Sequence, residues 1–279
     1  MVILSGKTKK PIPLGILQGR LSPSLDGRLQ FFPDDWPAEF AMATKLGFSA
    51  LEWLVDWREV ESNPILAKAE RKKITAMQTA TGCVVSSICA DYFMKFRLIG
   101  DDTLTSLSML ERLAQATTVT SNRLILIPLL EGNAPRNEEE LALVSKTFQQ
   151  IMPLMEEYHV RIALETELGA QKILDLLESV GSPMLGVYYD IGNCTSYGFD
   201  CPADILSLGE KVFGVHIKDR KKMSTNTVFL GTGDAKLMAC AKALKTIGFQ
   251  GIPILQAWRG ELFLDDAKKQ LEALRSQGW

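Results

Sequence analysis

Short apolar runs alternate with amphipathic stretches along the whole 279-residue chain. The runs are nearly continuous in apolar residues and are bounded by turn residues, which predicts buried strands. Strands of this kind are typical of parallel sheets whose two faces are both covered. Eight strands are expected, at Ile12–Leu17, Ala50–Val55, Cys83–Cys89, Arg123–Pro128, Val160–Glu165, Met184–Ile191, Val212–Ile217 and Ile252–Gln256.

The stretches between these runs carry apolar residues at helical spacing, and several are followed by a glycine that can close a helix. Asn137 and Glu140 have the spacing of a capping box, and Asp234 in the turn Leu230–Asp234 is a candidate N-cap. Eight helices are expected, at Trp36–Leu46, Pro64–Thr81, Asp101–Val119, Glu138–Tyr158, Ala170–Val180, Pro202–Gly209, Asp234–Ile247 and Leu262–Arg275.

Eight strand–helix units with no linker between them predict a single (β/α)8 TIM barrel that forms one domain over residues 1–279. The alternative is a doubly wound open sheet. Such a sheet usually carries a glycine-rich dinucleotide-binding turn after its first strand. The corresponding turn here begins Gln18-Gly-Arg-Leu-Ser-Pro, which lacks that pattern and therefore favours the barrel.

The composition narrows the classes of partner and the cellular compartment. A net charge of −2 gives no basic surface for nucleic acid. The five cysteines are widely spaced and form no C-x-x-C pair, which favours a reducing compartment. The N-terminal basic cluster follows only a very short apolar stretch, so no signal peptide is expected, and no apolar run is long enough to cross a membrane. We therefore expect a soluble cytoplasmic protein.

Four polar residues stand at the ends of four successive predicted strands: Glu165, Asp190, His216 and Gln256. In a (β/α)8 barrel the carboxyl ends of the strands meet at one mouth, where the active site forms. Carboxylate, imidazole and amide side chains suit a divalent cation such as Mn²⁺, Mg²⁺ or Zn²⁺. Each residue alone is better explained as a structural ion pair or a core histidine, but the four together favour a shared metal site.

Three residues near these strand ends are further candidates for a polar ligand. Asn193 can bind a sugar hydroxyl, although an Asx-turn explains it equally well. Arg220 suits a phosphate or carboxylate, and a salt bridge with Asp219 is the structural alternative. Lys218 lies two residues after His216, so strand alternation directs it toward the same side, although it ranks below Arg220 as a candidate.

The first half of the chain contributes weaker candidates for substrate binding. Gln18 and Arg20 follow the first predicted strand and can bind a sugar phosphate, although ordinary loop contacts are somewhat better supported. Glu52 and Trp53 lie near the end of the second strand. Trp53 or Trp258 can stack on a sugar ring, but an aromatic residue at a strand end more often belongs to the core.

Five segments together resemble the xylose isomerase-like TIM barrel superfamily. Within it they are most similar to the sugar-phosphate isomerase/epimerase branch, which includes tagatose/psicose 3-epimerases and hydroxypyruvate isomerases. The similarity covers nearly the whole chain and is strongest between residues 161 and 259. The segments are ALETE, GVYYDIGN, VFGVHIKDR, LGTGD and GFQGIPILQAWRG.

The resemblance implies metal ligands at the ends of strands five to eight, which fall on Glu165, Asp190, His216 and Gln256. The last position departs from the family, which has a second glutamate there. A neutral amide cannot act as a base, so weaker metal binding is expected and a two-glutamate epimerisation is in doubt. The family also has a histidine where this chain has Asn193.

The resemblance therefore implies a metal-dependent isomerase or epimerase for a small sugar or sugar phosphate. The reaction would be proton abstraction next to a carbonyl through a metal-stabilised enediolate, with Glu165 and Gln256 at the catalytic positions. The alternatives are a degenerate, non-catalytic sugar-binding barrel and a lyase or dehydratase for a related keto sugar. The superfamily's DNA-repair endonucleases need several histidines, and this chain has only two. A homodimer is an open option, and no nucleic-acid or membrane partner is expected.

Overall fold

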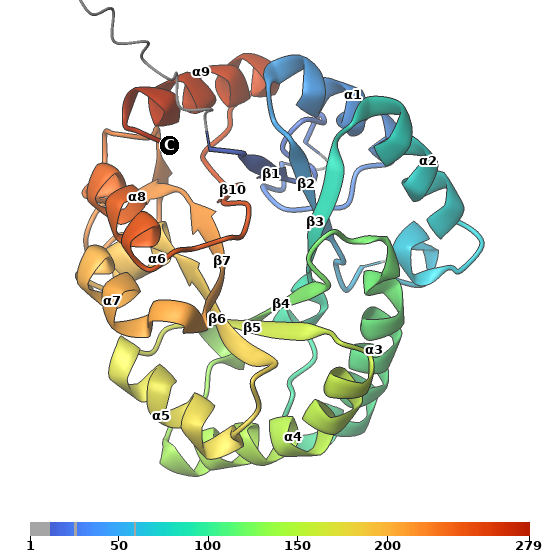
Figure 1. The fold of residues 1–279 in the computed structure, drawn as a ribbon, viewed down its shortest axis with the longest axis vertical. Coiled ribbons are helices and arrows are strands. Elements are labelled where there is room, and N and C mark those ends of the chain that lie inside the picture. The colour runs from blue at the N-terminus through green and yellow to red at the C-terminus, as the bar shows by residue number, and fades with distance from the viewer. Residues whose placement is uncertain (1–11, 25–26, 59) are drawn as a thin grey trace, which may run out of the picture.

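In the computed structural model, which describes residues 12–24, 27–58 and 60–279, eight parallel strands close into a barrel. Figure 1 shows this barrel inside a ring of helices. The strand order around the barrel is β1-β10-β7-β6-β5-β4-β3-β2. These strands are β1 (Gly15–Leu17), β2 (Ala50–Leu54), β3 (Val84–Cys89), β4 (Leu124–Leu129), β5 (Arg161–Thr166), β6 (Leu185–Asp190), β7 (Val212–Ile217) and β10 (Ile254–Leu255).

Pairing of the first and last of these strands, with Gly15 opposite Ile254, confirms the predicted (β/α)8 barrel and excludes the open sheet. The first eleven residues, where no signal peptide is expected, lie outside the described residues, as do residues 25–26 and 59. The prediction of one domain over residues 1–279 therefore extends beyond the part of the chain that the structure describes.

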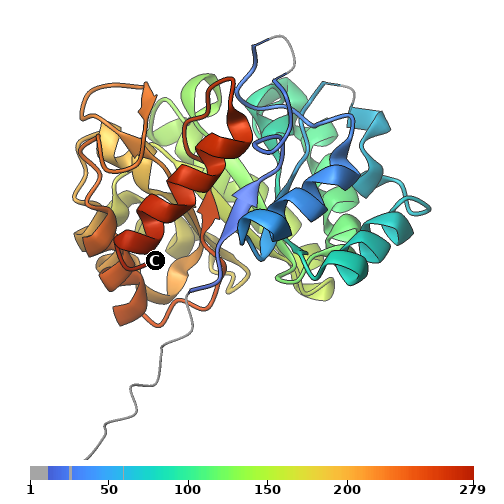
Figure 2. The same ribbon diagram turned by 90° about the horizontal axis from the view of Figure 1, so that it is seen from above.

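Nine α-helices occur in the described ranges, and most of them pack around the outside of the barrel. In Figure 2 the first and last of these helices lie side by side, so the two ends of the described chain meet on one flank. None of the helices in the described residues is long and apolar enough to cross a membrane. The helices are α1 (Trp36–Leu46), α2 (Arg71–Thr81), α3 (Thr103–Ala116), α4 (Glu138–Glu157), α5 (Ala170–Val180), α6 (Ile191–Ser196), α7 (Cys201–Leu208), α8 (Leu237–Thr246) and α9 (Phe263–Ser276).

Strand alternation divides the apolar residues into two cores. Side chains such as Leu54, Ala163 and Tyr188 belong to a small cluster within the barrel, whereas their strand neighbours pack in a large cluster between barrel and helices. Each large aliphatic or aromatic side chain buried in this way contributes about 1.5–3 kcal/mol. The same alternation brings Glu165 and Asp190 to the inside of the barrel, since they lie two residues beyond Ala163 and Tyr188.

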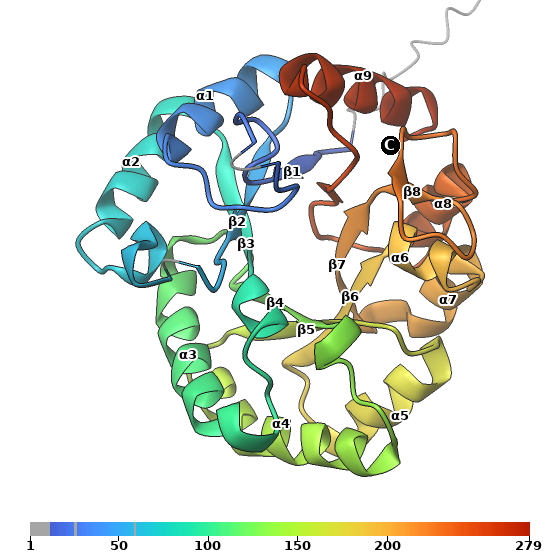
Figure 3. The ribbon, with the colours of Figure 1, turned by 180° about the vertical axis from the view of Figure 1, so that it is seen from behind.

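The structure corrects several predicted element boundaries. The predicted helix Pro64–Thr81 is a 3₁₀ turn at Pro64–Leu66 followed by α2. The short helix α6 directly after β6 was missed, as was a two-stranded antiparallel sheet of β8 (Asp219–Arg220) and β9 (Thr227–Val228). Figure 3 shows α6 and β8 close to β7. Both follow strand ends without an apolar repeat of their own, so hydrophobic periodicity could not reveal them.

The predicted caps have different outcomes. Asn137 accepts a hydrogen bond from the backbone N–H of Glu140 at 2.9 Å, which confirms the N-cap of α4. The N-cap prediction for Asp234 is wrong, because α8 begins at Leu237. Instead, the buried carboxylate of Asp219 accepts hydrogen bonds from three backbone N–H groups of this turn at 2.8–3.1 Å. The Asp219 carboxylate therefore occupies the backbone N–H groups to which an anion would bind.

Candidate active site

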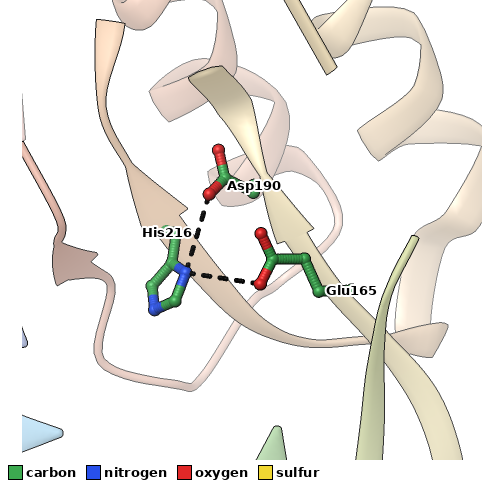
Figure 4. Close-up of side chains that lie close together, drawn as sticks. All are labelled: Glu165, Asp190 and His216. Atoms are coloured by element: carbon green, nitrogen blue, oxygen red, sulfur yellow. Dashed lines mark ion pairs between the residues drawn. The ribbon is translucent and has the colours of Figure 1, made fainter. Parts of the chain in front are cut away.

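Glu165, Asp190 and His216 meet at the carboxyl ends of β5, β6 and β7, as Figure 4 shows. One ligand atom from each lies within 4.8 Å of those of the other two, and all three residues are buried. The Nδ1 atom of His216 lies 3.7 Å from Asp190 Oδ2 and 3.9 Å from Glu165 Oε2. The fold therefore brings these three side chains together, as their positions at the strand ends predict.

Glu52, on β2, fixes the orientation of His216 through a contact with its Nε2 atom. The Nε2 atom of the imidazole lies 2.5 Å from Glu52 Oε2, while Tyr188 and Ser87 donate hydrogen bonds to Glu52 Oε1 at 2.6 and 2.7 Å. Because Glu52 can accept the Nε2 proton, Nδ1 is directed toward Glu165 and Asp190. A Cβ on Gly214 would lie 2.3 Å from the Tyr188 ring, so the glycine makes room for that ring under the site.

The electrostatic environment shifts the pKa values of the two carboxyl groups of the cluster, Glu165 and Asp190, in opposite directions. Burial raises the pKa of Glu165 to about 8, and the nearby Asp190 carboxylate acts in the same direction. Burial also acts to raise the pKa of Asp190, but Lys218 and His216 together outweigh it and hold that pKa below its usual value. Burial opposes the charge on His216, but Glu52 and Asp190 raise the pKa of the imidazole to about 10. Asp190 is thus the more firmly ionised of the two carboxyl groups.

The amide of Asn193, in α6, holds Glu165 from the side. Its Nδ2 group donates to Glu165 Oε1 at 2.7 Å, and its backbone N–H donates to Asp190 Oδ1 at 2.8 Å. The side chain of Asp190 therefore caps α6 as well as belonging to the cluster. The predicted contact between Asn193 and a sugar stays a prediction, since the observed contacts are with the two carboxyl groups.

Gln256 lies at the end of β10 and belongs to a polar chain across the barrel mouth. Lys218 Nζ donates to Gln256 Oε1 at 2.7 Å, and Gln256 Nε2 donates to Gln30 Oε1 at 3.2 Å. Gln30 also donates to Asp91, after β3. A lysine can only donate a hydrogen bond, so the oxygen of the Gln256 amide must point at Lys218 and its NH2 group at Gln30.

Of the first-half candidates, Gln18 and Arg20 are buried and bound to backbone groups. Gln18 Oε1 accepts from the N–H of Leu54 at 3.1 Å, and Arg20 donates to the carbonyl of Leu29. Burial lowers the pKa of Arg20 to about 10. Such contacts within the loop were the alternative to substrate binding in the sequence analysis. A role of either residue in substrate binding stays a prediction.

Glu39, in α1, holds the same loop from the outside and was missed from the sequence. Its carboxyl group accepts hydrogen bonds from the N–H groups of Gly19 and Leu21 and from the hydroxyl of Ser22, at 2.8–3.1 Å. Burial raises its pKa to about 7, although these hydrogen bonds act in the opposite direction. A lone glutamate on the apolar face of a predicted helix was the only signal available.

Two further candidates, Trp53 and Glu52, make internal contacts in the structure, and their proposed substrate contacts stay predictions. Trp53 points away from the barrel interior, packs against Trp36 and Phe32, and donates from Nε1 to Asn63. The reason is strand alternation, because its neighbour Glu52 points inward. Glu52 is itself fully buried next to His216 with both carboxylate oxygens engaged, so its observed contacts orient the histidine.

The remaining two candidates are Arg220 and Trp258. Arg220 is in β8, and its Nε atom is buried without a hydrogen-bond partner among the described residues. Its suggested partner Asp219 is occupied by the turn before α8. Trp258 is 39% exposed and borders a small cavity with Arg20 and Arg259. The proposed substrate contacts of Arg220 and Trp258 stay predictions.

The family of the chain follows from comparison with known proteins. The xylose isomerase-like TIM barrel family matches residues 40–277. The chain belongs to this family. Membership agrees with the closed barrel and with a cluster of polar side chains at the carboxyl ends of the strands.

Individual relatives are distant in sequence but similar over nearly their whole length. The L-ribulose-5-phosphate 3-epimerase UlaE of Shigella flexneri serotype 5b (strain 8401) is 23% identical over 263 residues, which are 89% of this chain and 88% of the relative. The apo structure of the 3-keto-D-glucoside 4-epimerase YcjR from E. coli has a TM-score of 0.74 at 15% identity, and covers 95% of this chain and 99% of that one. The IOLI protein with a bound zinc atom has a TM-score of 0.71 at 16% identity, over 95% and 96% of the chains.

The cluster fits a divalent cation at three positions. Two carboxylates and an imidazole are ligands for Zn²⁺ and Mn²⁺, and the Nδ1 atom of His216 is buried without a hydrogen-bond partner among the described residues. Binding of a cation to Nδ1 would require loss of its proton. Gln256 can add only a neutral amide oxygen, and that oxygen accepts the hydrogen bond from Lys218.

Proposed function

We propose that the protein is a metal-dependent isomerase or epimerase for a small sugar or sugar phosphate. The observation that carries this proposal is the buried group of Glu165, Asp190 and His216 at the mouth of a xylose isomerase-like barrel. The names of its relatives support a sugar substrate, since UlaE is a sugar-phosphate epimerase and YcjR a keto-glucoside epimerase.

In this proposal Glu165, Asp190 and His216 hold the divalent cation, with Gln256 as a neutral fourth donor. The cation, when bound, supplies Lewis acidity that polarises the substrate carbonyl and stabilises the oxyanion of the enediolate. Glu165 is the proton-transfer base, because both oxygens of Asp190 are engaged by Lys218 and by the backbone N–H of Asn193, and the amide of Gln256 is not basic. Asn193 keeps that carboxyl group in place through its hydrogen bond to Oε1.

The neutral side chain of Gln256 favours chemistry with a single base. A one-base reaction moves a proton between adjacent carbons on one face of the enediolate, as in aldose–ketose isomerisation. An epimerisation needs a second proton donor on the opposite face, and Gln256 cannot supply it. The identity of the product therefore tests the number of bases: an aldose–ketose pair indicates one base, and a pair of epimers indicates two.

A coupled assay over ketoses and ketose phosphates with added Mn²⁺ or Mg²⁺ tests the proposal. We expect turnover in the wild type and a loss of about 10²–10⁴-fold in Glu165→Gln, because the base is removed while the shape is kept. Glu167→Gln is the matched control, since Glu167 lies two residues further and contacts the backbone of Glu131. Absence of turnover on every substrate, or equal rates in the two variants, would contradict the proposal and favour the non-catalytic sugar-binding barrel.

A further inference from the structure

The side chain of Lys218 places a positive charge inside the candidate metal site. The residue is only 6% exposed. Its Nζ atom lies 2.7 Å from Asp190 Oδ2 and 2.7 Å from Gln256 Oε1. Lysine is rarely buried unless its charge is paired, so these two contacts identify a specific position for the ammonium group.

The contact with Asp190 falls on the one oxygen that a metal would need. Asp190 Oδ1 already accepts the backbone N–H of Asn193 at the start of α6. Oδ2 is the oxygen that lies 3.7 Å from His216 Nδ1 and faces the centre of the cluster. Lys218 and a divalent cation would therefore meet at the same oxygen, and their like charges oppose simultaneous occupancy.

The chain is shaped to keep Lys218 in this position. A Cβ on Gly192 would lie 2.3 Å from Cγ of Lys218 and 3.1 Å from its carbonyl oxygen, so only a glycine leaves room for the aliphatic part of the lysine. At the other end, Gln256 is held by Gln30, which keeps its oxygen directed at Nζ. The neutral amide at position 256 matters here, because it accepts the hydrogen bond without neutralising the ammonium.

We propose that Lys218 is a built-in cation that competes with a divalent metal for Asp190, so that metal enters the site only by displacing the ammonium from Oδ2. This proposal rests on the proposed metal site and adds a residue that sets its affinity. In the metal-free chain, Lys218 compensates the charge of Asp190. In the metal-loaded chain, the ammonium leaves Oδ2 of Asp190.

Calorimetric titration of the full metal-free chain with Mn²⁺ tests the proposal without reading turnover. Lys218→Met removes the charge, and Lys218→Gln removes the charge but keeps a donor for Gln256. We expect both variants to bind Mn²⁺ about tenfold more tightly than the wild type, or better, because the internal competitor is gone. Lys236→Met is the control: it removes the same charge and an exposed contact with Asp200, outside the site, and is expected to leave the affinity unchanged.

Thermal unfolding with and without Mn²⁺ provides a second readout of the same competition. We expect both Lys218 variants to show a larger upward shift in Tm on Mn²⁺ addition than the wild type and Lys236→Met. Lys218→Gln decides the question if Lys218→Met does not fold. Equal or weaker Mn²⁺ binding in the folded charge-removing variants would overturn the role of Lys218. That result would leave Glu165-dependent turnover, and with it the proposed function, untouched.

Discussion

The two sides of the barrel mouth use their buried polar residues differently. On the side of β5, β6 and β7, the side chains of Glu165, Asp190 and His216 face one another across a few ångströms. On the side of β1 and β2, Gln18 and Arg20 are tied to backbone groups of their own loop and its neighbour. Polar residues at strand ends therefore form a site only where their partners are other side chains, and elsewhere they stabilise the loops that surround it.

The largest effect on this difference between the two sides is expected when the charge of Asp190 is removed. In Asp190→Asn the cap of α6 can remain, but Lys218 loses its counter-charge in a buried environment. Removal of one partner of a buried ion pair costs about 3–5 kcal/mol, so we expect a loss of that size in the free energy of unfolding. Urea unfolding at neutral pH measures it. Asp200→Asn, which breaks the exposed pair with Lys236, should lower the free energy of unfolding by less than about 1 kcal/mol. Equal losses in Asp190→Asn and Asp200→Asn would contradict the buried ion pair of Asp190 and Lys218.

The loop side of the mouth should instead respond to pH through Glu39. The pKa of Glu39 rises from its usual 4.5 to about 7 on folding, so the folded chain holds this proton more tightly than the unfolded chain. Its contribution to stability is therefore greatest below pH 4.5 and falls by about 3 kcal/mol as the pH rises to about 7.

Urea unfolding of the wild type and Glu39→Gln between pH 4.5 and 8 isolates this effect. The wild type should lose stability relative to Glu39→Gln over the window, and the difference should level off above pH 7. Gln substitution of Glu111, an exposed residue of α3, should leave the wild-type pH dependence in place. A constant difference between wild type and Glu39→Gln would refute the assignment.

Glu52 joins the two sides, because it lies on β2 and contacts His216 on β7. In Glu52→Gln an amide N–H would face Nε2, which favours the tautomer with the proton on Nδ1, the atom needed for a metal. We expect Mn²⁺ affinity and kcat/KM to fall by about 10–100-fold with little change in Tm. Ser87→Ala also removes a contact of Glu52 but keeps the tautomer, so it should have a much smaller effect. Equal effects would contradict the orienting role.

The smallest functional effect is expected at Trp53. Trp53→Phe removes the hydrogen bond to Asn63 and part of the packing against Trp36, which should cost about 1–2 kcal/mol of stability. Since the ring lies outside the barrel, kcat/KM should stay within about twofold of wild type. A large rise in KM would show that the β2 side contacts substrate after all.

Most of the fold could be predicted from the sequence because its signals are local. Apolar runs and closing glycines located all eight barrel strands. The position of Glu165, Asp190 and His216 at the carboxyl ends of three successive strands then predicted that they lie together at the barrel mouth. The boundaries were less accurate where the local signal was weak, as in β10, where only Ile254–Leu255 is paired.

The partners of the site residues could not be predicted, because they come from other strands and depend on side-chain conformation. Alternation directed Lys218 toward the same side as His216, but the sequence could not show that Lys218 reaches Asp190 or that Glu52 contacts His216. Helix α6 was missed for a related reason: its N-cap is Asp190 itself, which the sequence presented as a metal ligand.

Anomalous diffraction from crystals soaked in Mn²⁺ tests the central claim most directly. The account predicts one strong peak among Glu165, Asp190 and His216, about 2.0–2.3 Å from the Nδ1 atom and from a carboxylate oxygen of each acid. A peak elsewhere in the molecule, or no peak at millimolar Mn²⁺ with these three side chains still in contact, would contradict it.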